Sequence, residues 1–272
     1  MPEWEGKSRK HNHYLMKEKV TIVKVGGAVV EDEGQTAQAL AAFSRVEGRK
    51  VLVHGGGRRA TQVAKSLGIE SKMVGGRRIT DAAMLQVVTM VYGGLVNKGL
   101  VAKLQALGIN ALGLTGADMD IIRSHKRPVK DIDYGFVGDV ERADGQALSA
   151  MLEAGITPVM APLTHDGRGN ILNTNADTIA SETAKALAQK YDATLIFGFE
   201  KRGVLANPGD DGSVIPVITR NDYKRYVADG TVAGGMMPKL ENAFNAIDAG
   251  VRRVIITGAT AIDGKHGTVI LP

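Results

Sequence analysis

VTIVKVGG at residues 20–27 and KVLVHGGG at residues 50–57 are the two stretches that decide the fold. Each is a run of apolar, largely β-branched residues that ends in consecutive glycines, and each is followed by a helix-like pattern, at residues 35–46 and 58–67. Further strands are expected at residues 110–114, 156–162, 193–199, 253–258 and 267–271. Strands that alternate with helices predict an α/β fold whose mostly parallel sheet is covered on both faces.

The same periodicity places the remaining elements. Residues 81–107 are expected to be largely helical, with an interruption at Gly93 and Gly94, and residues 119–140 to form a β-hairpin. A helix is expected over residues 176–190, and another begins at Pro238, a residue that suits the first helical position.

Glycine accounts for 34 of the 272 residues, about 15 more than the roughly 7% typical of proteins. A strand that ends in glycines before a helix leaves backbone N–H groups free to bind an anion, although glycine also serves simply to make the tight turn. Two such loops at one sheet edge favour a phosphate or carboxylate site. The stretch at residues 55–60 also satisfies G-x-G-x-x-A, typical of dinucleotide binding, but residues 70–81 contain no strand that ends in the required acid.

Composition excludes several classes of function. The absence of cysteine excludes disulfides, cysteine metal sites and thiol nucleophiles, and the net charge of +5 is too small to indicate a nucleic-acid partner. No apolar run approaches the roughly 18–20 residues of a membrane span, and the start of the chain is polar. We therefore expect a cytoplasmic protein with no membrane partner, and a poorly ordered extension at residues 1–18.

Three charged residues stand where structure alone would not favour them. Lys24 interrupts a buried strand one residue before a glycine loop, where it either reaches solvent at the strand end or meets phosphate oxygens. Lys239 lies in the first turn of a helix, where a cation opposes the helix dipole unless an anion binds. Asp177 either complements the dipole of its own helix or faces the two lysines.

Other polar residues give weaker signals. Arg78 follows a glycine pair and is either a solvated arginine or a bidentate carboxylate ligand. Asn173 ends a short strand and can hydrogen-bond a substrate. His54, His165 and His266 lack metal-ligand spacing, so we interpret them as structural and predict no side-chain metal site.

The motifs VKVGG, VHGGG, GGRRIT, NTNAD, FEKRGVL and GGMMPK, in this order over residues 20–270, resemble those of the amino acid kinase family. The resemblance implies a three-layer αβα sandwich around an open, mainly parallel eight-stranded sheet. It implies an N-lobe at residues 19–190 that binds an N-acylglutamate and forms a homodimer, and a C-lobe at residues 191–272 that binds ATP with Mg²⁺. The activity implied is phosphorylation of the side-chain carboxylate of N-acetyl-L-glutamate, a step of arginine biosynthesis.

The resemblance also implies roles for individual residues. Lys24 and Lys239 are expected to stabilise the transferring phosphoryl group, and Asp177 to organise both lysines. Gly55 and Gly56 are expected to bind the substrate through their N–H groups, together with Arg78 and Asn173. The nucleotide contacts implied are Gly26, Gly27, Glu200, Gly203, Leu205 and Gly235.

This chain departs from the family pattern in places. The nucleotide segment, usually T-D-V-x-G-V-L, reads FEKRGVL at residues 199–205, and a common G-K-D reads GAD at residues 116–118. The N-terminal extension is shorter than in arginine-inhibited hexameric members, which predicts an arginine-insensitive dimer. Alternatives left open are N-succinyl-L-glutamate or another acceptor of the same kinase fold, a non-catalytic sensing module, and a dinucleotide-binding oxidoreductase.

Overall fold

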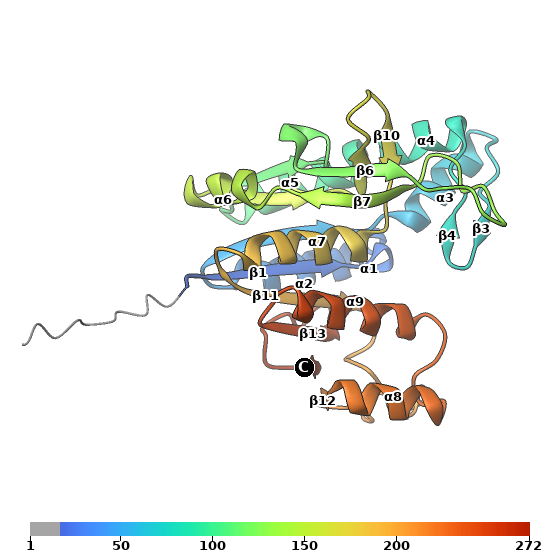
Figure 1. Cartoon of the computed structure of the whole chain (residues 1–272). Coiled ribbons are helices and arrows are strands. Elements are labelled where there is room, and N and C mark those ends of the chain that lie inside the picture. Colours follow the sequence, from blue (N-terminus) through green and yellow to red (C-terminus); the bar gives the residue numbers. More distant parts are fainter. Residues whose placement is uncertain (1–16) are drawn as a thin grey trace, which may run out of the picture.

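The computed structural model describes residues 17–272, and a central eight-stranded sheet runs through it (Figure 1). The strand order is β12-β14-β13-β11-β1-β2-β8-β5, and all neighbouring pairs are parallel except β13 with β14. The sheet strands are β1 (Lys19–Val25), β2 (Arg49–His54), β5 (Ala111–Leu114), β8 (Thr157–Met160), β11 (Asp192–Phe199), β12 (Val217–Ile218), β13 (Arg253–Gly258) and β14 (Thr268–Ile270). This arrangement confirms the predicted mainly parallel α/β sandwich.

The register of the central strands brings the glycine loops together. In β1, Val25 is paired with Gly198 of β11 on one side and with His54 of β2 on the other. The loops that follow β1 and β2 therefore leave the sheet at the same height and at the same edge, the carboxyl edge of the parallel strands.

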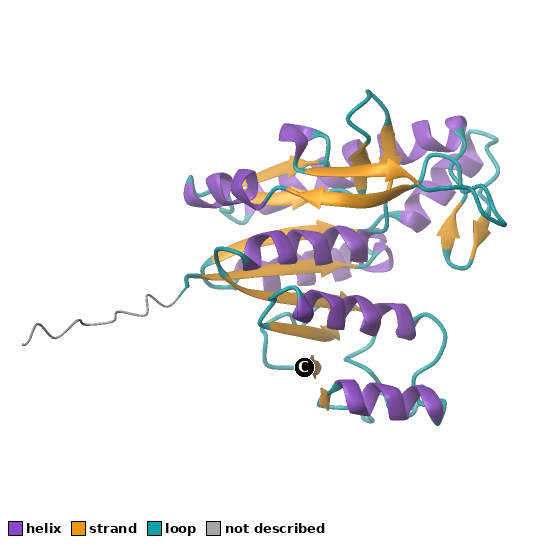
Figure 2. Cartoon of the chain, in the orientation of Figure 1, coloured by secondary structure: helices purple, strands orange, loops and turns teal. Residues whose placement is uncertain are grey.

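One face of the sheet is covered by helices from the first 106 residues (Figure 2). They are α1 (Gly27–Glu31), α2 (Glu33–Ser44), α3 (Gly57–Ser66), α4 (Ala82–Val88), the π-helical segment η1 (Thr89–Val96) and α5 (Asn97–Ala106). Phe43, Met84 and Leu104 from these helices pack with Leu52 and Ile196 of the sheet in one buried core.

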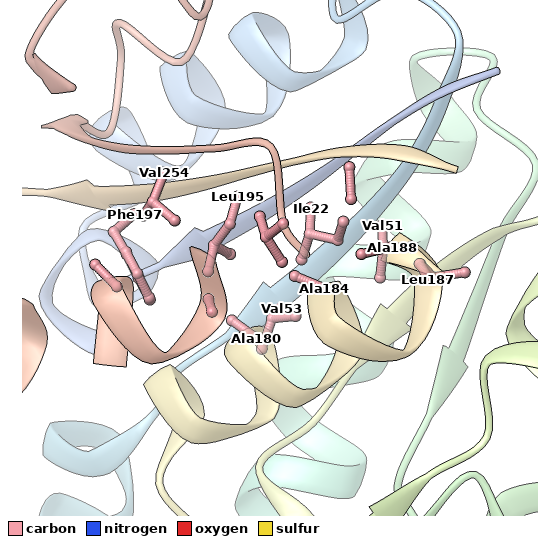
Figure 3. Close-up of a cluster of buried hydrophobic side chains, with 14 of the residues drawn as sticks. Ile22, Val51, Val53, Ala180, Ala184, Leu187, Ala188, Leu195, Phe197 and Val254 are labelled. Carbon is pink, nitrogen blue, oxygen red and sulfur yellow. The ribbon is translucent and has the colours of Figure 1, made fainter. Parts of the chain in front are cut away.

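The opposite face is covered chiefly by α6 (Gly145–Glu153), α7 (Ala176–Ala188) and α9 (Met236–Asp248), with α8 (Arg220–Ala228) packed beside α9. Figure 3 shows Ala180 and Ala184 of α7 against Ile22 and Val53 of the sheet. Small residues four positions apart form one smooth helix face, so α7 lies close to β1 and β2.

Smaller sheets complete the fold. The order β10 (Ile171–Asn173), β9 (Leu163–His165), β6 (Ile122–Lys126) and β7 (Gly138–Ala143) forms a four-stranded sheet whose β6–β7 pair is the predicted hairpin. A second hairpin joins β3 (Met73–Val74) to β4 (Arg77–Arg78), and η2 (Asp118–Asp120) is a single 3₁₀ turn.

Three expectations need correction or qualification. The helical stretch is continuous through Gly93 and Gly94, because it changes to π-helical hydrogen bonding there. Helix α9 begins at Met236, so Pro238 is its third residue. The predicted disorder at residues 1–18 falls mainly outside the described residues; Lys17, which is described, donates its Nζ–H to the carbonyls of Ala188 and Gln189.

The run Ala82–Ala106 is long and apolar enough to cross a membrane by length and composition alone, contrary to the expectation from sequence. In the fold it is a covering helix, and 44% of its apolar window is buried. Its inner residues belong to the core described above, whereas its outer face exposes Met90 and Leu95. This helix therefore has apolar residues on its outer face that residues 17–272 leave uncovered.

Candidate active site

A buried carboxylate lies between two lysines at the carboxyl edge of the sheet. Lys24 Nζ, near the end of β1, is 2.7 Å from Asp177 Oδ1, and Lys239 Nζ, in the first turn of α9, donates a hydrogen bond of 2.8 Å to Asp177 Oδ2. The three side chains come from segments more than 60 residues apart. The structure thus brings together the three residues for which the sequence suggested a common role.

Electrostatics keep this cluster charged. Burial by itself would raise the pKa of Asp177, but the charges of Lys24 and Lys239 outweigh it and hold the pKa below its usual range. Burial lowers the pKa of Lys239, and the Asp177 carboxylate opposes that shift. One negative and two positive charges leave an excess of one positive charge, which favours an anion at this position.

An aromatic ring lies under both ammonium groups. The Phe199 ring centroid, at the end of β11, is 4.0 Å from Lys239 Nζ and 5.3 Å from Lys24 Nζ. The ring in turn stacks on Phe197, with centroids 6.1 Å apart. Phe199 is one of the departures from the family pattern, and its role here is to offer a π-face to two cations.

The two glycine loops touch each other beside this cluster. A Cβ atom on Gly55 would lie 2.8 Å from the Gly27 nitrogen, and one on Gly27 would lie 3.2 Å from the Gly56 nitrogen. The contact at Gly55 is too short for any side chain, and the contact at Gly27 is tighter than an ordinary Cβ contact. Glycine is therefore required here for close approach of two backbones.

The hydrogen bonds of the loops correct part of the sequence interpretation. Gly55 donates its N–H to the Val25 carbonyl, and Gly26 donates to the Gly198 carbonyl. These two N–H groups extend the sheet and are not free to bind a ligand. Within residues 17–272, the N–H groups of Gly56 and Gly57 have no acceptor, so the donors available to an anion are displaced by one residue.

A cavity of about 190 Å³ opens beside these donors. It is lined by Gly55, Gly56, Gly57, Met73, Gly76, Arg77, Arg78, Tyr92, Val137, Pro162, Asn173, Thr174, Asn175 and Ala176. Its volume is below the roughly 300–1,000 Å³ of sites for drug-sized ligands, so it suits a small metabolite. Ala176 in its wall directly precedes Asp177, although none of the three cluster residues lines the cavity.

Arg78 forms part of the cavity wall and is 7% exposed. Its Nη2 donates to the Gly57 carbonyl and Thr61 Oγ1, and its Nη1 donates to Ser71 Oγ. These bonds fix the guanidinium group at the cavity. They also occupy donors that a solvated arginine would offer to a carboxylate.

Asn173 and Tyr92 complete the polar wall. Asn173 Nδ2 donates to Thr80 Oγ1 at 2.9 Å, and so β10 is tied to the segment after Arg78. Tyr92, which the sequence analysis did not single out, comes from η1. Burial raises the pKa of its hydroxyl, and the nearby charge of Arg78 lowers it in part. Only the glycines at residues 93–94 hinted at irregularity there, and π-helical segments frequently occur at functional sites.

The expected nucleotide segment follows β11. Glu200 is exposed, and its Oε1 lies 3.4 Å from Arg58 Nη2 in α3, the helix that follows the second glycine loop. Gly203 and Leu205 are buried, and a Cβ on Gly203 would lie 2.8 Å from Val214, which shows that packing requires this glycine. Gly235 is the exposed N-cap of α9, four residues before Lys239.

Two other features bear on the alternatives. Helix α3 leads into the β3–β4 hairpin and not into a neighbouring parallel strand, so the β2–α3 stretch does not form the βαβ unit of a dinucleotide site. No group of three His, Asp or Glu side chains with metal-binding geometry occurs among the described residues. A larger cavity of about 520 Å³ lies at the opposite edge of the sheet, lined by the starts of β1, β2 and β8, away from the lysine cluster.

Comparison with known proteins gives a consistent result. Residues 19–258 match the model of the amino acid kinase family. The chain is 67% identical over 255 residues to a protein named acetylglutamate kinase from Phocaeicola vulgatus, with 94% of this chain and 99% of that protein covered. A protein of the same name from Bacteroides thetaiotaomicron is 64% identical, with coverage of 94% and 99%. The crystal structure of smu.665 from Streptococcus mutans has a TM-score of 0.76 and 28% identity, with 92% and 98% of the two chains covered.

Proposed function

The chain belongs to the amino acid kinase family, and we propose that it transfers the γ-phosphoryl group of ATP to the side-chain carboxylate of N-acetyl-L-glutamate. The products are ADP and N-acetyl-L-glutamyl 5-phosphate, an acyl phosphate. The relatives named acetylglutamate kinase support this acceptor. A kinase with this acceptor serves arginine biosynthesis, and because it consumes ATP we place it in the cytoplasm.

The observation that carries the proposal is the Lys24–Asp177–Lys239 cluster, together with the small cavity lined by Ala176, the residue that precedes Asp177. A carboxylate is ionised at neutral pH and needs no general base to become a nucleophile. One of its oxygens attacks the γ-phosphorus while the bond to the ADP oxygen breaks, so no proton is transferred. The protein has only to position the reactants and to neutralise charge.

The residues divide between the two reactants. We propose that Gly56, Arg78 and Asn173 hold the acylglutamate in the N-lobe, residues 19–190, so that its side-chain carboxylate faces the cluster. Lys24 and Lys239 then contact the oxygens of the transferring group, with Asp177 holding both ammonium groups in place. The lysine charges are most effective here because the cluster is largely buried.

The nucleotide is assigned to the C-lobe, residues 191–272, at the segment from Glu200 to Leu205 and the N-terminus of α9. The exposed N-cap Gly235 offers a helix N-terminus to phosphate oxygens. Mg²⁺ commonly binds through nucleotide phosphates plus one or two carboxylates, and both oxygens of Asp177 are occupied by lysines. We therefore propose that Mg²⁺ enters with ATP, where it neutralises phosphate charge.

We also propose that the protein is a homodimer through the N-lobe. Met90 and Leu95 on the outer face of η1 are each 54% exposed, and Leu112, on the edge strand β5, is 41% exposed. Leu95→Glu should convert the dimer to a monomer in light scattering after gel filtration. Val217→Glu, on β12 at the other edge of the sheet, is the control; a monomeric parent protein would contradict the proposal.

The reaction is tested by trapping the acyl phosphate with hydroxylamine. With ATP and Mg²⁺, the chain should give a hydroxamate with N-acetyl-L-glutamate, and N-succinyl-L-glutamate and free glutamate are compared in parallel. Absence of hydroxamate with all three acceptors would refute the proposed function.

A further inference from the structure

Two fully buried polar side chains lie behind the substrate loop. His54, the last residue of β2, is 0% exposed, and Asn97, the first residue of α5, is 1% exposed. Asn97 Nδ2 is 3.1 Å from His54 Nε2 and donates to the Val159 carbonyl at 2.9 Å. His54 Nδ1 is 2.8 Å from the carbonyl oxygen of Gly55. The three contacts form a chain from α5 to the glycine loop.

These contacts determine where the imidazole carries its proton. A carbonyl oxygen only accepts, so the Asn97 atom that faces Val159 is the amide nitrogen, and its second hydrogen points to His54 Nε2. Nε2 must then be the lone-pair nitrogen. Burial lowers the pKa of His54 to about 4, so the ring is neutral at pH 7 and carries one N–H, at Nδ1. That N–H is donated to the Gly55 carbonyl.

The orientation of the Gly55 carbonyl determines that of the next N–H group. All peptide bonds in the described residues are trans, and in a planar trans peptide the C=O and the following N–H point in opposite directions. With its carbonyl held by His54, the Gly55–Gly56 peptide directs the Gly56 N–H away from the core. Gly56 lines the cavity, and its N–H has no acceptor within residues 17–272.

We propose that His54 and Asn97 are positioning residues for the acceptor substrate, because they lock the Gly55–Gly56 peptide with its N–H directed into the cavity. This inference rests on the proposed function of the cavity. A peptide between two glycines rotates easily because no Cβ restricts it. The rotated form would present the Gly55 carbonyl oxygen to an anionic substrate, and the His54 bond opposes that rotation before the substrate arrives.

The surroundings of Asn97 support a role beyond packing. A Cβ on Gly113 of β5 would lie 1.9 Å from Asn97 Oδ1, so the amide occupies space that only a glycine leaves free. Asn97 Oδ1 is itself buried without a hydrogen-bond partner. An apolar side chain would avoid that unsatisfied acceptor, so the amide is accounted for by the two bonds that it donates, to the Val159 carbonyl and to His54.

Two variants test the two hydrogen bonds of His54 one at a time. His54→Asn keeps a donor at the δ position, next to the Gly55 carbonyl, but loses the contact with Asn97. His54→Gln keeps an acceptor at the ε position for Asn97 but loses the donor to Gly55. We expect the KM for N-acetylglutamate to rise on the order of ten- to a hundredfold in His54→Gln, the effect of a weakened hydrogen bond to a charged group, and markedly less in His54→Asn.

The KM for ATP should stay unchanged in both variants, because the nucleotide side is not touched. Equal KM values for N-acetylglutamate in the two variants, or parallel losses toward both substrates, would overturn the proposal. A purely structural role would instead lower both thermal stabilities without separating the two KM values.

The imidazole tautomer is read directly from long-range ¹⁵N–¹H spectra of the wild-type protein, with the His54 signals assigned by their loss in a variant or by selective labelling. The Nδ1–H tautomer at pH 7 is expected. An Nε2–H tautomer or an imidazolium would overturn the inference even if neither variant folds. This result is independent of the hydroxamate assay, so failure of the proposed function and failure of the positioning role are distinguishable.

Discussion

The Asp177→Asn variant tests the charged cluster most directly. Asp177, Lys24 and Lys239 have side-chain exposures of 12%, 8% and 26%. At an effective dielectric constant near 20, each contact of 2.7–2.8 Å represents about 6 kcal/mol of attraction before desolvation. Desolvation cancels much of this, and removing one partner of a buried pair costs about 3–5 kcal/mol in total.

We therefore expect Asp177→Asn to lower the free energy of unfolding by about 3 kcal/mol, at the lower end of that range because Lys239 is partly exposed. The assay is urea denaturation at pH 7. The matched control is Asp211→Asn, which removes an exposed pair with Lys201 and should cost at most about 1 kcal/mol.

A phosphate-bearing ligand provides the second arm of the test. With the carboxylate gone, the two lysines keep their charge but lose their counterion, and a bound polyanion replaces it. The loss in unfolding free energy of Asp177→Asn, relative to wild type, should become smaller when ATP or inorganic phosphate is added at constant ionic strength. The loss in Asp211→Asn should not change. An unchanged stability of Asp177→Asn, or a deficit that phosphate does not reduce, would refute the view that the cluster is an anion site held by Asp177.

The remaining predictions concern the lysines, the ring and the histidine. Lys24→Met and Lys239→Met should each lower kcat by at least about a hundredfold, the effect of removing one preorganised charge, with little change in the KM for N-acetylglutamate. Steady-state kinetics with both substrates measures this. If the lysines only bind substrate, KM would rise and kcat would stay unchanged. Phe199→Leu removes the π-face from two ammonium groups and should lower kcat about three- to tenfold, whereas Phe199→Tyr keeps the ring and should stay near wild type. The pKa of His54 is near 6.5 in the unfolded chain and about 4 in the folded protein. As pH falls from 7 to 4, His54 therefore takes up a proton in the unfolded chain first, and the folded state loses stability. Over that range wild type should lose about 3 kcal/mol more unfolding free energy than His54→Asn, and parallel pH profiles from urea titrations would contradict the buried neutral state.

Local patterns were sufficient to predict most of the fold. The β-branched runs that end in glycine are long and regular, so β1, β2 and β11 follow from periodicity. The resemblance to a family implied an open, mainly parallel sheet of eight strands. The β3–β4 hairpin was missed although its signal was present. Gly75 and Gly76 both adopt positive φ, 55° and 74°, as a two-residue hairpin turn requires.

The site was less predictable where it depends on distant contacts. Lys24 and Asp177 are 153 positions apart; the residues alone left open whether Asp177 faces the lysines, and the resemblance to a family favoured that arrangement. Periodicity assumes 3.6 residues per turn, so it could not show that the π-helical turns of η1 bring Tyr92 to the cavity. The N–H of Gly55 was taken as free because the sequence does not show that the ladder between β1 and β2 extends one residue beyond His54.

The close contact between the glycine loops explains why so much glycine is concentrated at one edge of the sheet. The loop after β1 follows Lys24, and the loop after β2 carries the Gly56 N–H that we propose as a donor to the acceptor. Because the two backbones touch at Gly27 and Gly55, van der Waals contact fixes the separation between the lysine that we propose for the phosphoryl group and the amide that we propose for the acceptor. A transfer reaction that depends on holding two reactants in line needs such a fixed separation, and any side chain at this contact would widen it.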